Sequence, residues 1–403
     1  MDALPGAHVL VLVENMSVPS DRRVWAEARA LRDAGYRVTV VCPAGRIRDV
    51  EARAEIDGVE IHRFPLREAQ GGPAGYALEY ASALRHLRRL ARLVHDRTPV
   101  DVVHLCNPPD LLVFAVESLR RSGVRVVFDH HDLVPELFGA RFGLRQGLRP
   151  LLRLTRRLER TTFRRADVVV SPNETYRRIA IKRGGKSPED VFVVRMAPDT
   201  DRFSPGDPDP ALRRGKAHLI GYVGTMGAQD GVDQAVRALA ALRARRDDWH
   251  AILAGHGDAA EAAVRLAREL GVADVVDFPG YVDDAEIVRL LRTADVCLAP
   301  EPRNALNEAS TMIKIVEYMS FAKPVVALDL AEARASAGDG GAYAASDTPD
   351  ALAAELDRLL DNPELRERMG DEGRRRVTGE LSWERSRASL LAAYERVLSL
   401  PRT

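Results

Sequence analysis

The chain has 403 residues, of which 46% are hydrophobic, and its 59 basic and 59 acidic side chains give a formal net charge of zero. This length predicts two domains of about 200 residues, each with a full core. No apolar run approaches the roughly 18 residues of a membrane-spanning helix. We expect neither such a helix nor a signal peptide, because HVLVLV near the start is typical of a first strand.

Short Val-rich runs alternate with helix-period segments through the first half of the chain. We expect strands at 8–13, 37–41, 59–64, 102–105, 125–128, 168–170 and 191–194, and helices near 21–34, 76–97, 109–121, 145–163 and 173–183. Continuous apolar strands separated by helices are typical of a parallel sheet that is covered on both faces.

The second half repeats this scheme after segment 198–210, in which four prolines and four aspartates indicate a linker. We expect strands at 218–223, 250–253, 275–278, 296–299 and 325–328, and helices near 232–244, 258–270, 284–293, 311–320, 350–361, 364–377 and 383–398. The predicted fold class is α/β, with two doubly wound, Rossmann-like parallel-sheet domains facing across a cleft. We place the domains at 1–197 and 213–380, the linker at 198–212, and at 381–403 a C-terminal helix able to cross back to the first domain.

Charge and cysteine usage narrow the classes of partner. Residues 1–200 carry 33 basic and 25 acidic side chains, and the remainder carries 26 and 34. A basic first half favours an acidic partner or an anionic surface. Cys42, Cys106 and Cys297 are widely spaced, each in or just after a predicted strand. This spacing favours core packing over a disulfide or zinc site and indicates a cytoplasmic protein.

The segment STMIKIVEYMSFAKPVVA at 310–327 is the most informative local pattern. Lys314 and Glu317 are three residues apart, so they share one helix face near the start of that helix. Charged groups at a helix N-terminus that follows a strand suit a nucleotide diphosphate. The alternative is an amphipathic helix with a solvated Lys-Glu pair.

A dinucleotide-dependent oxidoreductase is disfavoured. Its fingerprint needs G-x-G-x-x-G directly after a strand, yet ENMSVPSD follows the first strand without a glycine. In the second half, GYVGTMGAQDG and LAGHGD end two strands with spaced glycines. Gly224 and Gly227 allow backbone amides to approach a phosphate, but no acidic residue ends a second strand about 20 positions on, and no P-loop occurs.

Together these motifs, in this order, resemble one family. DRRVWAEARALRDAGYRVTVVCP, NPPDLL, FDHHDLVPELF, GYVGTMGAQDGVD, LAGHGD, FPGYV, ADVCLAP and the 310–327 segment cover nearly the whole chain. The chain resembles the GT-B glycosyltransferases of the large family-four group, which are retaining and nucleotide-sugar-dependent. The resemblance implies a UDP- or GDP-sugar donor, no active-site metal, and transfer of a hexosyl or N-acetylhexosaminyl group. The acceptor is expected to be a hydroxyl of a glycan, a lipid-linked glycan or a small natural product.

The resemblance also implies a donor site in the second domain, in which Glu317 takes the position of a glutamate that hydrogen-bonds the nucleotide ribose. The family's second glutamate falls at Ala309, with Glu308 one residue off register. Either Glu308 is presented by a shifted loop, or backbone amides at 309–312 contact the sugar. The remaining donor-site residues implied are Gly224, Thr225, Met226, Gly227, Gly255, His256, Gly257, Tyr281, Val282, Ala309, Ser310, Thr311, Met312 and Ile313.

A second departure concerns the diphosphate. Relatives carry an arginine and a lysine where this chain has Thr225 and Asp230. A departing diphosphate needs positive charge when no metal is present. Lys314 is the expected replacement and Arg303 the second choice; the alternative for Lys314 is a surface lysine.

In the first domain, the resemblance places His131 near the donor sugar or the reacting bond. The alternatives are that His130 has this role or that both histidines are structural. Asp132 is expected to bind acceptor hydroxyls or to cap a helix. Asn15 to Arg23 is the loop after the first strand, where acceptors and donor phosphates meet in this fold. Asn15 is an expected acceptor contact, and either Arg22 or Arg23 is expected to reach into the cleft. Asp21 is the expected N-cap of the next helix. The chain shows no carboxylate pair of glycosidase type, so catalysis would rest on positioning and on stabilising the leaving diphosphate.

A basic amphipathic segment at 141–165 holds nine arginines and one glutamate, with Arg145, Arg149, Arg153, Arg156 and Arg160 in a stripe. A second basic run lies at 85–97. Such helices can lie on anionic lipid, so the protein is expected either to be peripheral at the inner face of a membrane or to have a solvated arginine face. Nucleic acid is not an expected partner, since no aromatics interleave with the arginines. Two other functions stay open: a GT-B nucleotide-sugar epimerase, and a degenerate sugar-nucleotide-binding protein.

Overall fold

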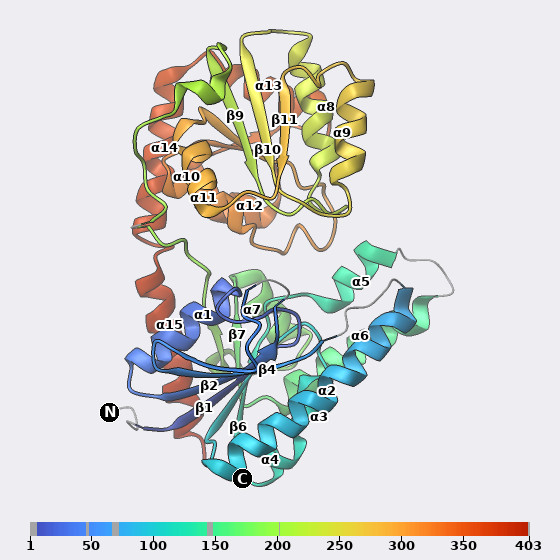
Figure 1. Ribbon diagram of the computed structural model, residues 1–403, viewed down its shortest axis with the longest axis vertical. Helices are drawn as coiled ribbons and strands as arrows, with labels where there is room; N and C mark the ends of the chain where they lie inside the picture. Colours follow the sequence, from blue (N-terminus) through green and yellow to red (C-terminus); the bar gives the residue numbers. More distant parts are fainter. Residues whose placement is uncertain (1–5, 46–47, 67–71, 143–147, 201, 402–403) are drawn as a thin grey trace. The chain divides into compact units, whose positions relative to one another are not determined.

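The computed structural model describes residues 6–45, 48–66, 72–142, 148–200 and 202–401. It divides into two compact units (Figure 1). Unit 1 consists of Met1–Arg195 together with Ser386–Thr403, and unit 2 consists of Met196–Arg385. The chain therefore leaves unit 1 once and returns to it near its end.

Unit 1 is built on an eight-stranded sheet of order β3-β4-β2-β1-β5-β6-β7-β8. The strands are β1 His8–Leu12, β2 Arg37–Pro43, β3 Arg53–Ile56, β4 Val59–Phe64, β5 Val102–Cys106, β6 Arg125–Asp129, β7 Val168–Ser171 and β8 Val191–Val193. All neighbours are parallel except β3 and β4. The seven predicted strands are confirmed, and β3 was missed because RAEI is a partly exposed edge strand without an apolar run.

Helices cover both faces of this sheet. Helices α1 (Arg22–Asp33) and α15 (Trp383–Ser399) lie on one face, and α2 (Gly72–Arg97), α3 (Leu112–Ala115), α4 (Glu117–Arg121) and α6 (Arg149–Arg165) lie on the other (Figure 1). Asp21 caps α1 as predicted, since its side chain accepts from the Val24 amide at 3.1 Å. Helices α5 (Val134–Phe142) and α7 (Glu174–Lys182) complete the unit, and α5 was not predicted. The predicted helix start at 145, with Arg145, lies outside the described residues.

Unit 2 has a six-stranded, fully parallel sheet of order β11-β10-β9-β12-β13-β14. The strands are β9 His218–Val223, β10 Trp249–Ala254, β11 Val276–Gly280, β12 Val296–Ala299, β13 Val325–Leu328 and β14 Gly341–Ala344. Helices α8 (Val232–Arg243) and α9 (Ala260–Glu269) lie on one face, whereas α10 (Asp284–Thr293), α11 (Ile313–Ser320) and α14 (Pro363–Thr378) lie on the other (Figure 1). Helix α13 (Pro349–Leu360) packs beside α8.

Two short elements of unit 2 escaped prediction: β14, and helix α12 (Ala331–Ala337). Both are alanine-rich, AEARASA in α12 and GAYA in β14, so they lack the run of large apolar residues that marks a strand or helix. The predicted strands and helices of unit 2 are otherwise present to within a few residues. Among the helices of the described residues, none has the length and apolar character to cross a membrane.

The strand order of each unit reverses at one point. In unit 1 the order runs outward in both directions from β1 and β5, and in unit 2 it does so from β9 and β12. Loops leaving the carboxyl ends of such a strand pair diverge to opposite faces of the sheet, and the opening they leave is where ligands bind in doubly wound folds. The loops after β9 and β12 hold Gly224 and Glu301, and that after β5 holds Asn107.

Candidate active site

In unit 2, the two glycine-rich loops after β9 and β10 pack backbone against backbone. Gly255 and Gly257 have φ angles of +152° and +151°. A β-carbon on Gly255 would stand 1.8 Å from the Gly224 carbonyl oxygen, and one on Gly257 would stand 2.6 Å from that of Met226. The Met226 amide donates to the carbonyl of His256 at 2.9 Å. These glycines are therefore needed for the loops to meet, which gives their spacing a physical reason independent of any ligand.

Lys314, near the start of α11, lies against this loop pair and is buried. Its Nζ is 2.5 Å from Glu301 Oε1 and 3.8 Å from Asp230 Oδ1. The ammonium also stands 4.6 Å from the centre of the Tyr222 ring. A β-carbon on Gly224 would be 3.2 Å from Nζ, so the lysine fills the space that a side chain there would take. The surface-lysine alternative is wrong.

The charges around Lys314 explain how a buried ammonium is tolerated. Burial lowers the pKa of Lys314, but Glu301, Tyr222 and Asp230 more than offset this and raise the pKa overall. Burial raises the pKa of Asp230, and Lys314 opposes that rise only in part. Two carboxylates thus face one ammonium. The resemblance places a phosphate-binding lysine at position 230; here that position is Asp230, and Lys314 of α11 lies beside it.

Asp230 also closes the glycine loop. Its Oδ2 accepts from the Gly227 amide at 2.9 Å. A backbone amide at the end of a strand-loop-helix connection is a typical anion donor, and a carboxylate of the chain itself occupies this one.

The other predicted donor-site residues are distributed around α11 and the loop ends. Met226 and Ala309 are buried, and Glu317 is half-buried on α11. Tyr281 is 71% exposed and meets His256 edge to face, with 5.6 Å between ring centres. Of the rest, Thr225 and Ile313 are exposed, and Gly224, Gly227, Gly255, Val282, Ser310, Thr311 and Met312 are partly exposed, while Gly257 is exposed.

Glu308 has partners of its own in unit 2. It is ion-paired with Arg303, and its Oε2 accepts from the Ala331 amide at 2.9 Å, at the first residue of α12. Arg303 in turn pairs with Asp347 at 2.8 Å and donates to the carbonyl of Asp329 at 2.8 Å. These contacts anchor the loop before α11 to the start of α12. A catalytic role for Glu308 would therefore require it to give up Arg303 and the Ala331 amide as partners.

In unit 1, the two adjacent histidines after β6 differ in environment. His130 is fully buried, and its ring packs against those of Phe163 and Tyr176 at 4.8 and 5.2 Å between centres. Burial lowers its pKa to about 3. His131 keeps 14% of its side chain exposed, and its Nδ1 lies 3.0 Å from Asp129 Oδ2. His131 is therefore the histidine with access to a ligand.

Asn107 holds the backbone of this turn. Its Oδ1 accepts from the amides of His131 and Asp132 at 2.9 and 3.0 Å. Its Nδ2 donates to the Asp132 carbonyl at 2.7 Å and to Asp110 at 3.0 Å. Burial raises the pKa of Asp132, although the neighbouring His131 limits that rise. One side chain from the NPPDLL motif thus fixes both predicted residues, His131 and Asp132.

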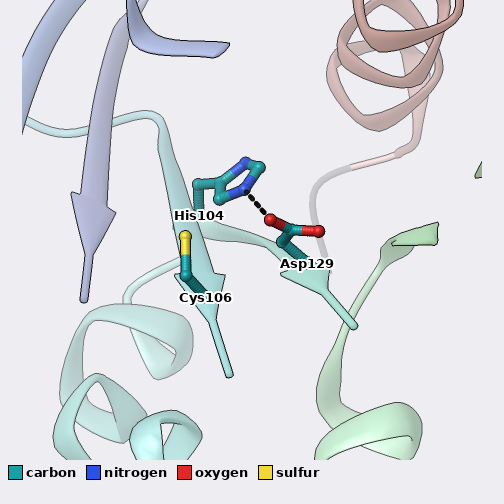
Figure 2. A group of neighbouring side chains, drawn as sticks. All are labelled: His104, Cys106 and Asp129. Atoms are coloured by element: carbon teal, nitrogen blue, oxygen red, sulfur yellow. Dashed lines mark ion pairs between the residues drawn. The ribbon is translucent and has the colours of Figure 1, made fainter. Parts of the chain in front are cut away.

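Asp129 is the centre of a buried charge network. Arg23 donates to both of its oxygens, from Nε at 3.1 Å and Nη2 at 2.7 Å. Although burial opposes ionisation, Arg23 and His131 hold the pKa of Asp129 well below its usual range. Arg23 also pairs with Glu27 at 3.0 Å, and His104 lies 3.7 Å from Asp129 (Figure 2).

His104, Cys106 and Asp129 offer ligand atoms within 4.8 Å of one another, and all three are buried. A metal fits this group poorly. The Arg23 guanidinium already takes both Asp129 oxygens, and burial raises the pKa of the Cys106 thiol to about 12, whereas a metal needs the thiolate. We interpret the group as part of the charge network.

The predicted acceptor residues Asn15 and Arg22 are both exposed. Asn15 lies in the loop after β1, and Arg22 is the first residue of α1. Their neighbours Glu14 and Arg23 are the buried ones. Burial, together with Glu79, raises the pKa of Glu14 to about 8, and its Oε1 has no hydrogen-bond partner among the described residues.

Sequence reasoning missed Glu14, Glu27, His104 and Glu301, and it named Arg23 only as the alternative to Arg22. A signal for two of them was present, because Arg23 and Glu27 share a helix face with Val24, Ala28 and Leu31, all buried. Charged residues on an apolar face indicate a buried pair. His104 and Glu301 carried no such signal, since their partners come from distant segments.

Comparison with known proteins agrees with this architecture. Residues 207–376 match the family model described as "Glycosyl transferases group 1", and residues 20–197 match the one described as "Glycosyl transferase 4-like domain". An MMP alpha-(1->4)-mannosyltransferase of Mycolicibacterium hassiacum is 32% identical over 216 residues, covering 53% of this chain and 50% of that protein. A D-inositol 3-phosphate glycosyltransferase of Geodermatophilus obscurus is 32% identical over 244 residues, covering 57% and 52%. The chain thus spans about half the length of these curated relatives.

Solved structures match over the whole chain. A sucrose-phosphate synthase from Thermosynechococcus elongatus has a TM-score of 0.77 at 17% identity, covering 98% of this chain and 99% of that one. HepE of Anabaena in complex with UDP and glucose has a TM-score of 0.73 at 18% identity, covering 97% and 99%. At these identities the likeness shows the GT-B fold alone.

Proposed function

Since this chain belongs to the group 1 glycosyl transferases, we propose that it moves a sugar from a nucleotide diphosphate donor to an acceptor hydroxyl, with retention of configuration and without a metal in the active site. The observation that carries the proposal is Lys314. Its ammonium lies beside the glycine loop after β9, 3.8 Å from Asp230, where relatives place a phosphate-binding lysine. A cation held there would offset the charge that develops on the leaving diphosphate.

Each residue then has a role that its position supports. Glu317 would accept from the ribose hydroxyls with charge-assisted strength. Amides of the loops at 224–227 and 255–257 would meet the phosphates, and Ser310, Thr311 and Met312 would meet the sugar. In unit 1, His131 and Asp132 would meet the acceptor or the donor sugar, with Asn15 and Arg22 at the rim. Unit 1 is thus the acceptor domain and unit 2 the donor domain.

The donor is proposed to be a UDP- or GDP-sugar and the transferred group a hexose or N-acetylhexosamine. UDP is favoured because structures of the same fold are described in complex with UDP and UDP-glucose. The relatives' names include an inositol phosphate and a mannosyl transfer, which favours a polyol, glycan or lipid-linked glycan acceptor.

Donor hydrolysis tests the proposal without knowing the acceptor. The protein is incubated with a panel of UDP- and GDP-sugars, with EDTA present, and nucleoside diphosphate release is measured. We expect slow release from one donor. Conversion of the donor to a new nucleotide sugar would instead indicate the epimerase, and binding without any release would indicate a degenerate binding protein. Once an acceptor is found, proton NMR of the product decides retention.

We propose that the protein is cytoplasmic and lies at an anionic membrane face. An open groove of about 910 Å³ on unit 1 is lined by arginines of α2 and by the apolar side chains of Leu93 and Phe114. Arg165 of α6 lies over the ring of Phe114, a residue of α3, at 4.7 Å, so α6 adds an arginine beside this groove. Basic side chains around exposed apolar ones suit an anionic lipid surface.

Vesicle sedimentation tests this surface. We expect binding to vesicles that contain phosphatidylglycerol, weakening with salt, and little binding to phosphatidylcholine alone. The variant Arg88→Glu/Arg92→Glu should lose binding. The control variant Arg265→Glu/Arg268→Glu makes the same change of charge on α9 of unit 2 and should retain vesicle binding. An equal loss of binding in both variants would show that only the net charge of the protein matters.

A further inference from the structure

The C-terminal helix reaches the charge network around Asp129. Tyr394 of α15 is fully buried, and its hydroxyl lies 2.8 Å from His104 Nδ1. The two rings are stacked, with 8° between their planes. On its other side, His104 Nε2 faces Glu27 Oε2 at 3.4 Å and Asp129 Oδ2 at 3.7 Å. Figure 2 shows His104 directed at the Asp129 carboxylate.

The charges in this network balance only with a second cation. Glu27 and Asp129 are both nearly or fully buried carboxylates, and Arg23 supplies one positive charge to the pair. Buried charges are tolerated when they are paired. The second positive charge can reside on either of the two histidines that face Asp129, which are His104 and His131. The identity of the charged histidine decides whether His131 is neutral.

The surroundings of the two rings favour His104 as the histidine that carries the second positive charge. His104 Nε2 faces two carboxylates and therefore carries a proton, and Nδ1 faces a hydroxyl oxygen able to accept a second one. His104 thus has a hydroxyl oxygen at hydrogen-bond distance from Nδ1. Its Nε2 has two carboxylates at ion-pair distance but no hydrogen-bond partner among the described residues. His131 has the Asp129 carboxylate at Nδ1 and keeps part of its ring exposed.

We propose that Tyr394 is a positioning residue: its hydroxyl holds His104 as a buried imidazolium, which supplies the second cation of the network and leaves His131 neutral. Neutral His131 then donates Nδ1–H to Asp129 and presents Nε2 as an acceptor to a substrate hydroxyl. This inference rests on the proposed function only for the role of His131. The protonation of His104 stands on the network alone.

The direction of the pKa shift of His104 agrees with this proposal. The pKa of His131 is also raised, so the neutrality of His131 rests on the charge balance of the network and on the partial exposure of its ring. Burial lowers the pKa of His104, but Tyr394, Cys106 and Asp129 more than offset it and hold the pKa well above its ordinary value. Burial also lowers the pKa of His131, Asp129 raises it overall, and Arg23 limits the rise. The titratable and charged groups that face the two rings are Arg23, Glu27, Cys106, Asp129, His130, Asp132 and Tyr394.

Tyr36 provides a matched control. Its ring lies 5.5 Å from that of Tyr394, it is buried, and its hydroxyl has no hydrogen-bond partner among the described residues. Tyr36→Phe and Tyr394→Phe therefore remove the same atom from the same packed pair, and only the second removes the partner of His104.

The test is nitrogen NMR of the full chain with ¹⁵N-labelled histidine, from pH 5 to 10, with His104→Gln to assign that ring. In the wild type we expect both nitrogens of His104 to stay protonated to pH 9, while His131 is neutral at pH 7.5. In Tyr394→Phe, His104 becomes neutral and the network loses a positive charge. The pKa of His131 should then rise by about one unit, a tenfold gain in proton affinity, and the acidic limb of turnover should move with it.

A neutral His104 at pH 7 in the wild type, or a cationic His131 beside it, would overturn the inference. An unchanged His131 pKa in Tyr394→Phe would do the same, as would an equal shift in Tyr36→Phe. If Tyr394→Phe does not fold, the wild-type spectra still decide. Failure of the proposed function is a separate outcome, because a protein that releases no nucleoside diphosphate still yields these spectra.

Discussion

The carbonyl oxygen of Gly224 lies 1.8 Å from the place where a β-carbon on Gly255 would stand. The backbones at Gly224 and Gly255 cannot move apart without separating the loops after β9 and β10. The Gly224 amide also donates to the Ala254 carbonyl at 3.1 Å, and that hydrogen bond would be lost. Gly255 therefore fixes the shape of the proposed phosphate site, although it offers no side chain.

Gly255→Ala should destabilise unit 2 by about 2–4 kcal/mol, because strain at positive φ adds to a backbone clash. Gly271→Ala is the control: it also has positive φ, at +70°, but nothing lies within 4 Å of its β-carbon. It should cost only the strain, about 1–2 kcal/mol. Urea unfolding measures both. Equal losses would show that the loops move apart freely.

Lys314→Met should destabilise the protein by about 3–5 kcal/mol, since it leaves Glu301 buried without its cation. The double variant Lys314→Met/Glu301→Gln removes both charges and should recover most of that stability. Turnover should stay low in both variants if the ammonium acts on the diphosphate. Calorimetry should show weakened binding of nucleoside diphosphate and unchanged binding of nucleoside. A double variant with restored turnover would assign Lys314 a purely structural role.

Glu317→Ala should weaken nucleotide binding by about 1–3 kcal/mol, because two ribose hydroxyls lose a charged acceptor. Isothermal titration with UDP and with GDP measures the loss. Glu269→Ala, an exposed glutamate at the end of α9, is the control and should bind as the wild type does. Unchanged affinity in Glu317→Ala would remove that residue from the site.

Glu14 should make the stability of unit 1 depend on pH. Its pKa is raised from 4.5 to about 8 by burial and by Glu79, so the folded protein binds a proton that the unfolded chain releases. Its contribution is complete below pH 4.5 and is lost as the pH rises to about 8, with a slope of at most about 1.4 kcal/mol per pH unit. Glu14→Gln should flatten this slope, whereas exposed Glu55→Gln should retain it. Urea midpoints between pH 5 and 9 provide the measurement, and parallel profiles for wild type and Glu14→Gln would contradict it.

Most strands of both sheets could be predicted because their buried apolar runs are continuous. The loops that contain Gly224 and Gly255 could be predicted because these glycines directly follow such runs. The sequence could not predict β3, an edge strand with exposed polar residues, or β14, a short strand without a run of large apolar residues. The paired environment of Lys314 was also hidden, since Glu301 lies 13 positions away on a different loop. Which of His130 and His131 is buried depends on the rings of Phe163 and Tyr176, which come from later helices. Long-range partners of this kind leave no local pattern.

Because unit 1 is built from both ends of the chain, its completion is delayed during synthesis. Residues up to Arg195 leave the ribosome first, but the helix that carries Tyr394 leaves only after all of unit 2 has been made. Until then the face of the sheet beside α1 lacks its second helix, and His104 lacks its hydroxyl partner. His104, and with it the environment of His131, would therefore be complete only once α15 has been made.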